Sequence, residues 1–223
     1  MECNNSGIIL LQSSSHNYIY DNIVKHHKYG AVLLDFYSEY NIIDNNTIMN
    51  QGVTDRDNGD IQIIEANNNI FSNNTLISSN DRLYGVRFFS NSYNTIFENN
   101  TFTGYKISGI SAGSGIIRYN DFIDCDTGIT LYDTGDVYYN NFINCNKGIN
   151  LIRCNGTNIK YNNFIDNNKH ADFQFFSIFN TWNGNYWDEP RDSLYIIRGK
   201  LFLFIPWFNF DWNPAQEPYD IGV

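Results

Sequence analysis

Short runs of alternating apolar residues recur along most of the chain, and each run follows a small residue. The runs begin at Gly7-Ile8, Gly30-Ala31, Gly85-Val86, Gly109-Ile110, Gly128-Ile129 and Gly148-Ile149. Within residues 128–133 and 148–153, every second residue is apolar, and β-branched and aromatic residues are dense. Alternation of this kind is typical of strands, whereas a helix repeats about every 3.6 residues. The pattern predicts an all-β chain in which each repeat opens with a glycine turn.

An asparagine-centred step follows each apolar run, and successive steps are roughly 20 to 28 residues apart, a spacing typical of solenoids. The steps are Asp21-Asn22, Asn45-Asn46, Asn73-Asn74, Asn99-Asn100, Asn120-Asp121, Asn140-Asn141, Asn162-Asn163 and Asn183-Gly184-Asn185. Stacked hairpins would need an Asn-Gly or Asp-Gly turn in every unit, whereas a parallel coil explains the constant order of the runs.

We therefore predict a single-stranded parallel β-helix of about eight coils, each with two short strands and an asparagine corner. Equivalent residues of neighbouring coils should lie about 4.8 Å apart and form columns. Asparagine suits such a corner because it tolerates the left-handed backbone and its amide bonds to the amides above and below. Asn74, Asn100 and Asn141 are expected in one column.

The repeats end near residue 189. All four prolines and all four tryptophans lie at or beyond Trp182. Proline interrupts strand ladders, and an open solenoid end exposes core and unpaired backbone. We expect residues 1–189 to form the repeats and residues 190–223 to form a capping tail. The N-terminal end has no comparable lid and shows no signal-peptide pattern, so we expect it to be incomplete.

Composition and charge narrow the possible partners. The chain is 42% hydrophobic and 17% aromatic, which excludes a disordered protein. Its net charge of −10 disfavours nucleic acid and anionic membrane surfaces, which bind clustered lysine and arginine. No apolar run reaches the length of about 18 residues that a membrane span requires. Nucleic acid, an anionic membrane and a membrane span are therefore not expected. The expectation of a polysaccharide or a surface protein as partner comes from the outward faces of the strands and not from composition.

The repeats resemble a known family. The Gly-Ile-x-Leu runs, the Asn-Asn-Thr-Ile and Asn-Asn-Phe-Ile steps and the closing segment 182–188 resemble right-handed parallel β-helix proteins of the NosD type. The tail 205–214 is similar to the endings of archaeal members. The resemblance implies a right-handed β-helix in the periplasm, at the cell surface or outside the cell. It also implies a place among carbohydrate-binding and sugar-hydrolase repeats, with NosD itself an accessory in copper-site maturation.

The residues themselves give little support for a metal site. Copper favours Cys, Met and His ligands brought together. The chain has two methionines, Met1 and Met49, and its histidines are His16, His26, His27 and His170. His26 and His27 are expected in a solvated turn, where adjacent side chains point apart. We assign no metal site and no cofactor.

The cysteines are interpreted as buried thiols. Cys125 and Cys145 are twenty residues apart at equivalent positions, so they should stack on adjacent coils. Their Cα spacing permits a disulfide, but parallel side-chain vectors make its geometry poor. Cys3 and Cys154 have no equivalent partner, so the four cysteines indicate neither a disulfide framework nor a zinc site.

Ligand binding is expected on the outward face of the first strand of each coil. Alternation assigns inward positions to Ile8, Leu10, Ile61, Ile63, Val86, Phe88, Ile129, Leu131, Ile149 and Leu151. One outward row is Ile9, Val32, Gln62, Arg87, Ser111, Thr130, Asn150 and Gln174. The next outward row is Leu11, Leu34, Ile64, Phe89, Gly113, Tyr132, Ile152 and Phe176. This second row is unusually apolar, which favours coverage by a loop or self-association over sugar binding. Gln62, Arg87, Phe89 and Tyr132 are the candidate binding residues.

Catalysis at the strand ends is a weaker hypothesis. Asp35 and Glu65 are expected on neighbouring coils, as are Asp133 and Arg153. Two carboxyl groups about 5 to 9.5 Å apart would suit a glycosidase, and an arginine near a carboxylate would suit a lyase. The simpler interpretation is that the carboxylates stabilise turns and that Asp133 forms a surface ion pair with Arg153.

These observations predict an exported or surface-located repeat scaffold that binds carbohydrate or a protein partner. A polysaccharide hydrolase or lyase that uses Asp35, Glu65, Asp133 or Arg153 is the alternative. A copper-maturation accessory of the NosD type is a third possibility, and it rests on the resemblance alone.

Overall fold

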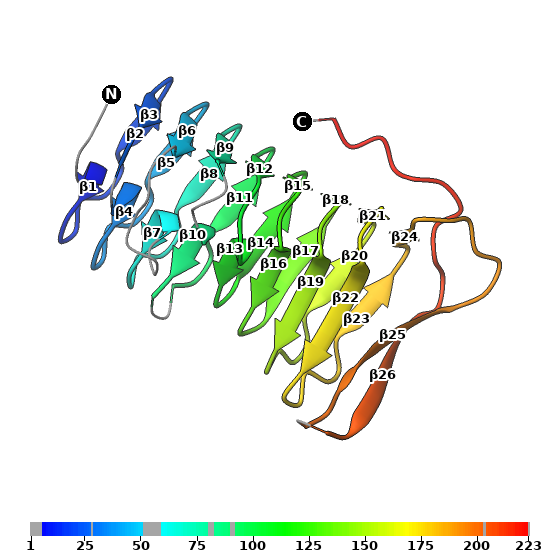
Figure 1. Cartoon of the computed structure of the whole chain (residues 1–223). Helices are drawn as coiled ribbons and strands as arrows, with labels where there is room; N and C mark the ends of the chain where they lie inside the picture. The colour runs from blue at the N-terminus through cyan, green and yellow to red at the C-terminus, as the bar shows by residue number, and fades with distance from the viewer. Residues whose placement is uncertain are drawn as a thin grey trace.

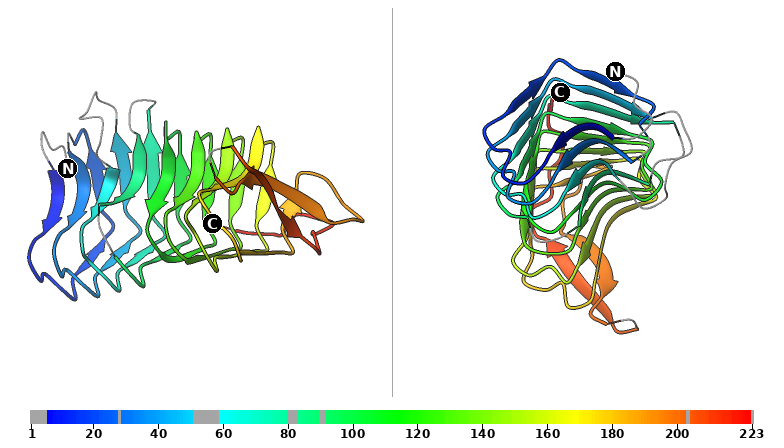
Figure 2. Two further views of the ribbon diagram at one scale, coloured as in Figure 1. Left: turned by 90° about the horizontal axis from the view of Figure 1, so that it is seen from below. Right: turned by 90° about the vertical axis from the view of Figure 1, so that its left-hand side faces the viewer.

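The chain coils into a rod of stacked strands (Figure 1). The computed structural model describes residues 6–27, 29–50, 59–79, 83–89, 92–202 and 204–222, and within these ranges the regular elements are all strands. Each coil contributes one strand to each of three sheets, and every pair of strands from successive coils is parallel. Viewed along the rod, the coils superimpose around a common interior (Figure 2).

Three sheets run the length of the rod. The first sheet contains β1 (Ser6–Leu10), β4 (Gly30–Leu34), β7 (Gly59–Ile63), β10 (Tyr84–Phe88), β13 (Ser108–Ala112), β16 (Thr127–Leu131), β19 (Lys147–Ile152) and β22 (Lys169–Gln174). The second sheet contains β2 (Tyr18–Tyr20), β5 (Ile42–Asp44), β8 (Ile70–Ser72), β11 (Ile96–Glu98), β14 (Gly115–Arg118), β17 (Gly135–Tyr138), β20 (Asn158–Lys160), β23 (Thr181–Asn183), β26 (Pro206–Asp211) and β25 (Tyr195–Lys200). The third sheet contains β3 (Ile23–Lys25), β6 (Thr47–Asn50), β9 (Thr75–Ser78), β12 (Thr101–Thr103), β15 (Asp121–Ile123), β18 (Asn141–Ile143), β21 (Asn163–Ile165) and β24 (Tyr186–Trp187).

The parallel β-helix predicted from the repeats is confirmed, because the first and third sheets are each eight strands deep. The prediction of two strands in each coil is wrong. A third strand follows every asparagine corner, and most of these strands are only three residues long. A run of three residues is too short for alternation to be recognised in the sequence. In the second strand of the fourth coil, Phe97 points inward and Ile96 outward.

The core is built from equivalent residues that lie above one another. Ile61, Val86, Ile110, Ile129 and Ile149 occupy one register position of the first sheet and are at most 1% exposed. Ile8, Leu10 and Phe88 are partly buried against the same core. The inward positions predicted from the alternation are therefore confirmed.

A buried asparagine ladder holds the coils in register at the corner between the second and third sheets. Its members are Asn22, Asn46, Asn74, Asn100, Asn120, Asn140, Asn162 and Asn185. Each Oδ1 accepts the backbone N–H and the side-chain amide of the ladder residue one coil earlier, as Asn120 does from Asn100 at 2.9 Å in both bonds. The amide of Asn100 also donates to the carbonyls of Phe71 and Glu98.

The expectation that Asn141 stands in this column is wrong by one residue, because Asn140 takes the ladder position and Asn141 pairs with Asp121. The residue before each ladder asparagine bends the backbone into the left-handed region. It is Asp21 in the first coil, then Asn45, Asn73 and Asn99, then Tyr119, Tyr139 and Tyr161, and Gly184 in the last coil. The ladder position therefore moves to the first residue of the Asn-Asn step in the later coils.

Aromatic rings stack along the interior of the third sheet. Phe102, Phe122, Phe142, Phe164 and Trp187 form a phenylalanine ladder with ring centroids 4.5 to 5.1 Å apart. The facing glycines of the first sheet leave room for these rings, since a Cβ on Gly128 would lie 2.6 Å from Phe142 and one on Gly148 2.8 Å from Phe164. These glycines therefore lie within strands, and the prediction that they form turns is wrong.

The C-terminal residues continue the second sheet past the last coil. β26 pairs with β23 through Trp182 and Asp211, and β25 pairs with β26 in an antiparallel hairpin. The hairpin extends beyond the outline of the coils (Figure 2). Residues 212–222 then turn back along the rod, where Tyr219 bonds to Asn163 and the carbonyl of Ile221 accepts from Asn141. The division of the chain at residue 189 remains a prediction.

Asp211 closes the asparagine ladder with a carboxylate. Its Oδ2 accepts the backbone N–H and the side-chain amide of Asn185 at 2.9 and 3.0 Å and the Trp187 indole N–H at 3.1 Å. Its Oδ1 accepts the N–H of Gly184 at 3.1 Å, and the side chain is fully buried. The ladder continues no further beyond Asp211, so the residue at this position needs to accept hydrogen bonds but not to donate one. A carboxylate therefore fits here, whereas each preceding coil has an asparagine amide.

We predict that Asp211→Ala lowers the free energy of unfolding by about 3 kcal/mol or more, because several buried donors lose their acceptor together. Urea unfolding followed by tryptophan fluorescence measures the change. Asp211→Asn should cost less, since one amide oxygen remains. The exposed Asp192→Ala is the control, and an equal loss in both alanine variants would contradict this role of Asp211.

Candidate functional site

The four binding residues expected on the first sheet differ in their surroundings. Gln62 is 9% exposed and its side-chain amide donates to the carbonyl of Tyr29. The guanidinium of Arg87 lies over the rings of Tyr84 and Phe89, at 4.8 and 4.7 Å from their centroids. Phe89 and Tyr132 are 42% and 50% exposed. The two aromatic residues are exposed, Arg87 is half-buried and Gln62 is buried, and the binding role of all four remains a prediction.

Two coils depart from the predicted outward rows. Leu33 pairs with Gln62, and Asp172 pairs with Asn150, so these residues replace Val32 and Gln174 in the first row. Val32 and Leu34 are buried at 1% and 0% exposure and belong to the core. By the same register, Asp35 and Gln174 replace Leu34 and Phe176 in the second row. The second row is therefore less apolar than the sequence indicates.

The catalytic candidates do not converge. Leu34 pairs with Ile63, and the N–H of Tyr37 donates to the carbonyl of Glu65. Phe36 therefore stands over Glu65, and the expected stacking of Asp35 on Glu65 is wrong by one residue. Asp35 accepts the N–H of Phe36 at 3.0 Å and so stabilises its own turn.

Asp133 and Arg153 follow the paired residues Leu131 and Leu151 by two positions, but among the described residues no ion pair joins them. The carboxylate of Asp133 accepts the N–H of Thr134 at 2.8 Å, and the guanidinium of Arg153 lies 5.8 Å from the ring centroid of Phe175. Asp133 thus stabilises its turn, and the surface ion pair expected from the sequence is absent.

A groove runs along the outer face of the second sheet, where two adjoining clefts share Asp136 and Asn158. The larger cleft, about 560 Å³, is lined by Ile96, Ile116, Gly135 and residues of the neighbouring turns. The smaller, about 300 Å³, is lined by Tyr138, Tyr139, Lys160 and Tyr161. We call the two clefts the second-sheet groove.

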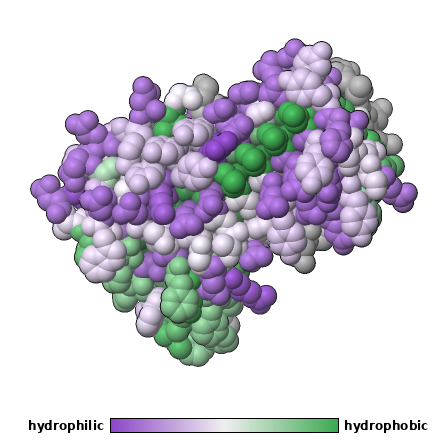
Figure 3. Space-filling model, turned by 180° about the vertical axis from the view of Figure 1, so that it is seen from behind, coloured by the Kyte–Doolittle hydropathy of each residue, from purple (hydrophilic) through white to green (hydrophobic). Residues whose placement is uncertain are grey.

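The groove changes from apolar to polar along one register column. Ile42, Ile70, Ile96 and Ile116 are followed in the same column by Asp136 and Asn158. Asn158 donates to Asp136 at 2.7 Å, which fixes both polar side chains. Figure 3 shows a diagonal row of hydrophobic surface across the coils and a larger apolar patch at the bottom.

Tyrosines line the polar end of the groove. Tyr119, Tyr139 and Tyr161 stack with centroid distances of 5.4 and 5.2 Å, and Tyr138 meets Tyr139 edge-on at 6.1 Å. All three stacked tyrosines have a left-handed backbone, with φ between 54° and 58°. Such a conformation is costly for a bulky residue and often marks a functional position. The recurring Tyr-Asn step is visible in the sequence, but the asparagine repeat alone does not indicate that these tyrosines stack.

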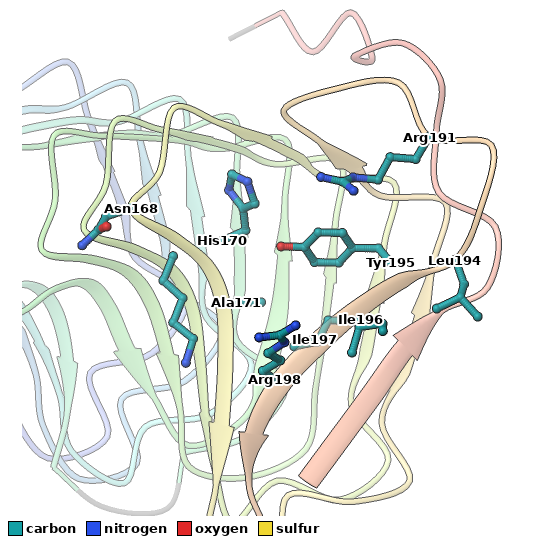
Figure 4. Close-up of a pocket in the computed structure, with 10 residues that line it drawn as sticks. Asn168, His170, Ala171, Arg191, Leu194, Tyr195, Ile196, Ile197 and Arg198 are labelled. Carbon is teal, nitrogen blue, oxygen red and sulfur yellow. The ribbon is translucent and has the colours of Figure 1, made fainter. Parts of the chain in front are cut away.

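A second pocket lies between the last coil and the hairpin (Figure 4). It measures about 500 Å³ and lies between the start of β22 and β25, with Lys169, His170, Arg191, Tyr195 and Arg198 on its walls. A smaller cavity of about 310 Å³ adjoins it and adds Lys200 and Asp172. We call these two cavities the cap pocket. The sequence alone does not indicate this pocket, because β22 and β25 meet only in the folded chain.

One polar cluster is enclosed in the interior. The Nε2 of His27 lies 2.7 Å from Oδ1 of Asp60, and the hydroxyl of Tyr105 donates to Oδ2 of Asp60 at 2.7 Å. The three residues are at most 1% exposed. None of them lines the second-sheet groove or the cap pocket, so the cluster serves the core. His26 is exposed and His27 is buried, so the adjacent histidines point apart as predicted, although His27 is not solvated.

Three cysteines are buried as free thiols. Cys125 and Cys145 stand on adjacent coils, as predicted, and the N–H of Asn146 donates to the carbonyl of Cys125. The neighbouring thiol of Cys145, together with burial, raises the pKa of Cys125. The thiol of Cys154 donates to the carbonyl of Leu131 at 3.2 Å, and burial raises its pKa to about 12. Met1 and Cys3 lie outside the described residues.

A family comparison agrees with the architecture. The family model described as "Periplasmic copper-binding protein (NosD)" matches residues 1–116 and 53–192, which together cover most of the chain. The chain belongs to the NosD family. The resemblance seen in the asparagine steps is thereby confirmed, and the family's description supports a periplasmic or extracellular location for this member.

Other comparisons add little for this NosD-family chain. No curated protein matches it. Among solved structures, the plasmid-mediated fluoroquinolone resistance protein QnrB1 is 14% identical, with 81% of each chain covered and a TM-score of 0.23. A TM-score this low supports no conclusion about the fold or function of the chain. Within the described ranges, no helix has the length and apolarity needed to cross a membrane.

The part of this NosD-family member that the structure describes does not bring a set of copper ligands together. Among the described residues, no three His, Cys, Asp or Glu side chains lie close enough to hold a metal ion. His16 stacks on Tyr40, the Nε2 of His27 is occupied by Asp60, and the thiols of Cys125 and Cys145 bond to backbone carbonyls. Soft ligands for copper are therefore present but dispersed or already bonded.

We predict that Asp60→Ala lowers the free energy of unfolding by about 3 to 5 kcal/mol, because it removes a buried acceptor shared by His27 and Tyr105. Equilibrium urea unfolding at pH 7 tests this. Asp60→Asn should retain part of the stability, whereas the exposed Asp126→Ala should cost less than about 1 kcal/mol. A similar loss in all three variants would refute the role of the cluster.

A further prediction concerns Cys154, whose pKa is raised to about 12 in the folded chain. The unfolded thiol ionises near pH 8.5, so the stability that comes from the buried neutral thiol is present below about pH 8.5 and declines as the pH rises toward 12. Unfolding free energies measured at pH 7, 9 and 10 should therefore fall further for the wild type than for Cys154→Ala. Parallel profiles for the two proteins would show that the prediction is wrong.

Proposed function

We propose that this protein is a glycan-binding scaffold and that the second-sheet groove holds the sugar chain. The observation that carries the proposal is the polar end of the groove, where Tyr138, Tyr139 and Tyr161 stand beside Asp136, Asn158 and Lys160. A sugar ring presents an apolar face and a rim of hydroxyls, so it needs both aromatic contact and hydrogen-bonding side chains.

The repeat supports a polymer in preference to a single sugar. Asp136 and Asn158 occupy the same position on successive coils, as do Tyr138 and Lys160. Strand spacing places such pairs about 4.8 Å apart, so a chain laid along the rod can contact successive coils. The groove extends over the coils of β11, β14, β17 and β20, which gives several consecutive contacts.

The backbone supports a binding role for the tyrosines. Asparagine fills the left-handed position in several coils, and it does so at lower cost than tyrosine. Stacking among Tyr119, Tyr139 and Tyr161 offsets part of that cost, and Tyr219 of the tail packs edge-on against Tyr139 and Tyr161. The rings are thus fixed before a ligand arrives, which lowers the entropy lost on binding.

The alternatives have weaker support. The first-sheet face offers exposed Phe89 and Tyr132, but Gln62 and Arg87 are engaged within the protein. A protein partner or self-association on that face remains the second interpretation of its apolar residues. Hydrolase or lyase chemistry lacks a converging pair among Asp35, Glu65, Asp133 and Arg153. A copper role rests on the family description alone.

A glycan array followed by pull-down on insoluble polysaccharides tests the proposal. We expect Tyr138→Ala and Lys160→Ala each to weaken binding about tenfold, which corresponds to the loss of one aromatic or charged contact. Tyr132→Ala is the matched control, because it removes an exposed tyrosine from another sheet.

The results distinguish whether the protein binds glycans from where on its surface it binds them. Binding lost in Tyr132→Ala and Phe89→Ala but kept in Tyr138→Ala would place the site on the first sheet. Absence of binding to every glycan on the array and to every insoluble polysaccharide would overturn the glycan-binding proposal itself. Circular dichroism and the unfolding midpoint confirm that each variant is folded.

A further inference from the structure

The cap pocket gathers positive charge in an acidic protein. The chain has 14 lysines and arginines and a net charge of −10, and four of those cations line the two cavities of this pocket. They are Lys169, Arg191, Arg198 and Lys200. Cations placed together repel one another, so a cluster of this kind indicates a negatively charged ligand or an internal counter-ion.

Internal carboxylates neutralise only part of the cluster. Asp172 is 2.8 Å from the Nζ of Lys169 and 3.2 Å from the Nζ of Lys147, so one carboxylate is shared by two lysines. Burial lowers the pKa of His170, and the charges of Asp188 and Asp166 oppose part of this shift. Among the described residues, no ion pair joins Arg191 or Arg198 to a carboxylate.

Two buried nitrogen atoms at the pocket have no hydrogen-bond partner in the described part of the chain: Nδ1 of His170 and Nε of Arg191. A buried polar atom without a partner is costly, and native proteins rarely leave one unless a ligand or water completes the bond. Figure 4 shows the side chains of Arg191, His170 and Tyr195 gathered on one side of the pocket, with Arg198 below them.

Two of the side chains that frame the pocket are held by neighbouring rings. The guanidinium of Arg191 lies 5.0 Å from the ring centroid of Tyr195, and Tyr195 stacks on Trp187 at 4.0 Å. The Tyr195 ring is thus already engaged, which favours charge over aromatic stacking as the means of recognition. A planar guanidinium binds a carboxylate, sulfate or phosphate through paired N–H donors.

We propose that the cap pocket is a binding site for an oxyanion group of the carboxylate, sulfate or phosphate class, with Arg191, Arg198 and Lys169 as its ligands. A volume of about 500 Å³ leaves room for more than the anion alone, such as an acidic sugar. The site is separate from the second-sheet groove and does not depend on the proposed function of that groove.

Isothermal titration of the full chain with sodium sulfate, inorganic phosphate and galacturonate tests the proposal, with sodium chloride adjusted to keep the ionic strength constant. We expect saturable binding of at least one of the three ions. Arg198→Gln and Arg191→Gln should each weaken it about tenfold, the effect of losing one charge-assisted hydrogen bond. The preferred ion distinguishes a planar carboxylate from a tetrahedral anion.

The controls keep this result independent of folding and of the groove. Lys25→Gln removes a cation at the other end of the rod and should bind the anion as the wild type does, as should Tyr138→Ala. The Nε–H resonance of Arg191 should shift on titration in a ¹⁵N-labelled sample. Lack of saturable binding by the wild type, or wild-type affinity in both arginine variants, overturns the proposal.

Discussion

The register between coils is the constraint on which every other feature of this protein depends. The asparagine ladder fixes that register, because each side chain accepts two bonds from the coil before it and donates to carbonyls of its own surroundings. These groups are buried, so a slip by one residue would leave several donors and acceptors without partners at once. The phenylalanine ladder, the glycines that face it and the tyrosines of the groove all take their alignment from this corner.

The same constraint explains what could be predicted from the sequence. Repeated Asn steps and Gly-Ile runs identify a parallel coil, because a ladder demands the same residue at the same place in every turn. They also identify most of the buried side chains of the first sheet, although Val32 and Leu34 were assigned outward and are buried. The predicted ladder residue was wrong by one position at Asn140 and Asn141. A tyrosine takes the preceding left-handed position there, and the sequence does not distinguish two consecutive asparagines.

The candidate sites were harder to predict, and the reasons are physical. The second-sheet groove depends on strands of three or four residues, whose inward and outward sides cannot be told apart by alternation. The cap pocket depends on contact between β22, the last strand of the first sheet, and β25, which lies in the C-terminal hairpin outside the regular repeat. The charges of Lys169, Arg191 and Arg198 are visible in the sequence, but their convergence is a property of the fold.

The returning tail ties the last coils to one another. Backbone groups of Ala215, Tyr219 and Ile221 bond in turn to residues 185, 163 and 141, each one coil nearer the middle of the rod. Force applied at the C-terminal end is thus shared across three turns from the start, and the final turn cannot peel away alone. In a solenoid each coil contacts only its neighbours, so the terminal coil can unfold first. Here that unfolding must begin with the release of the returning tail.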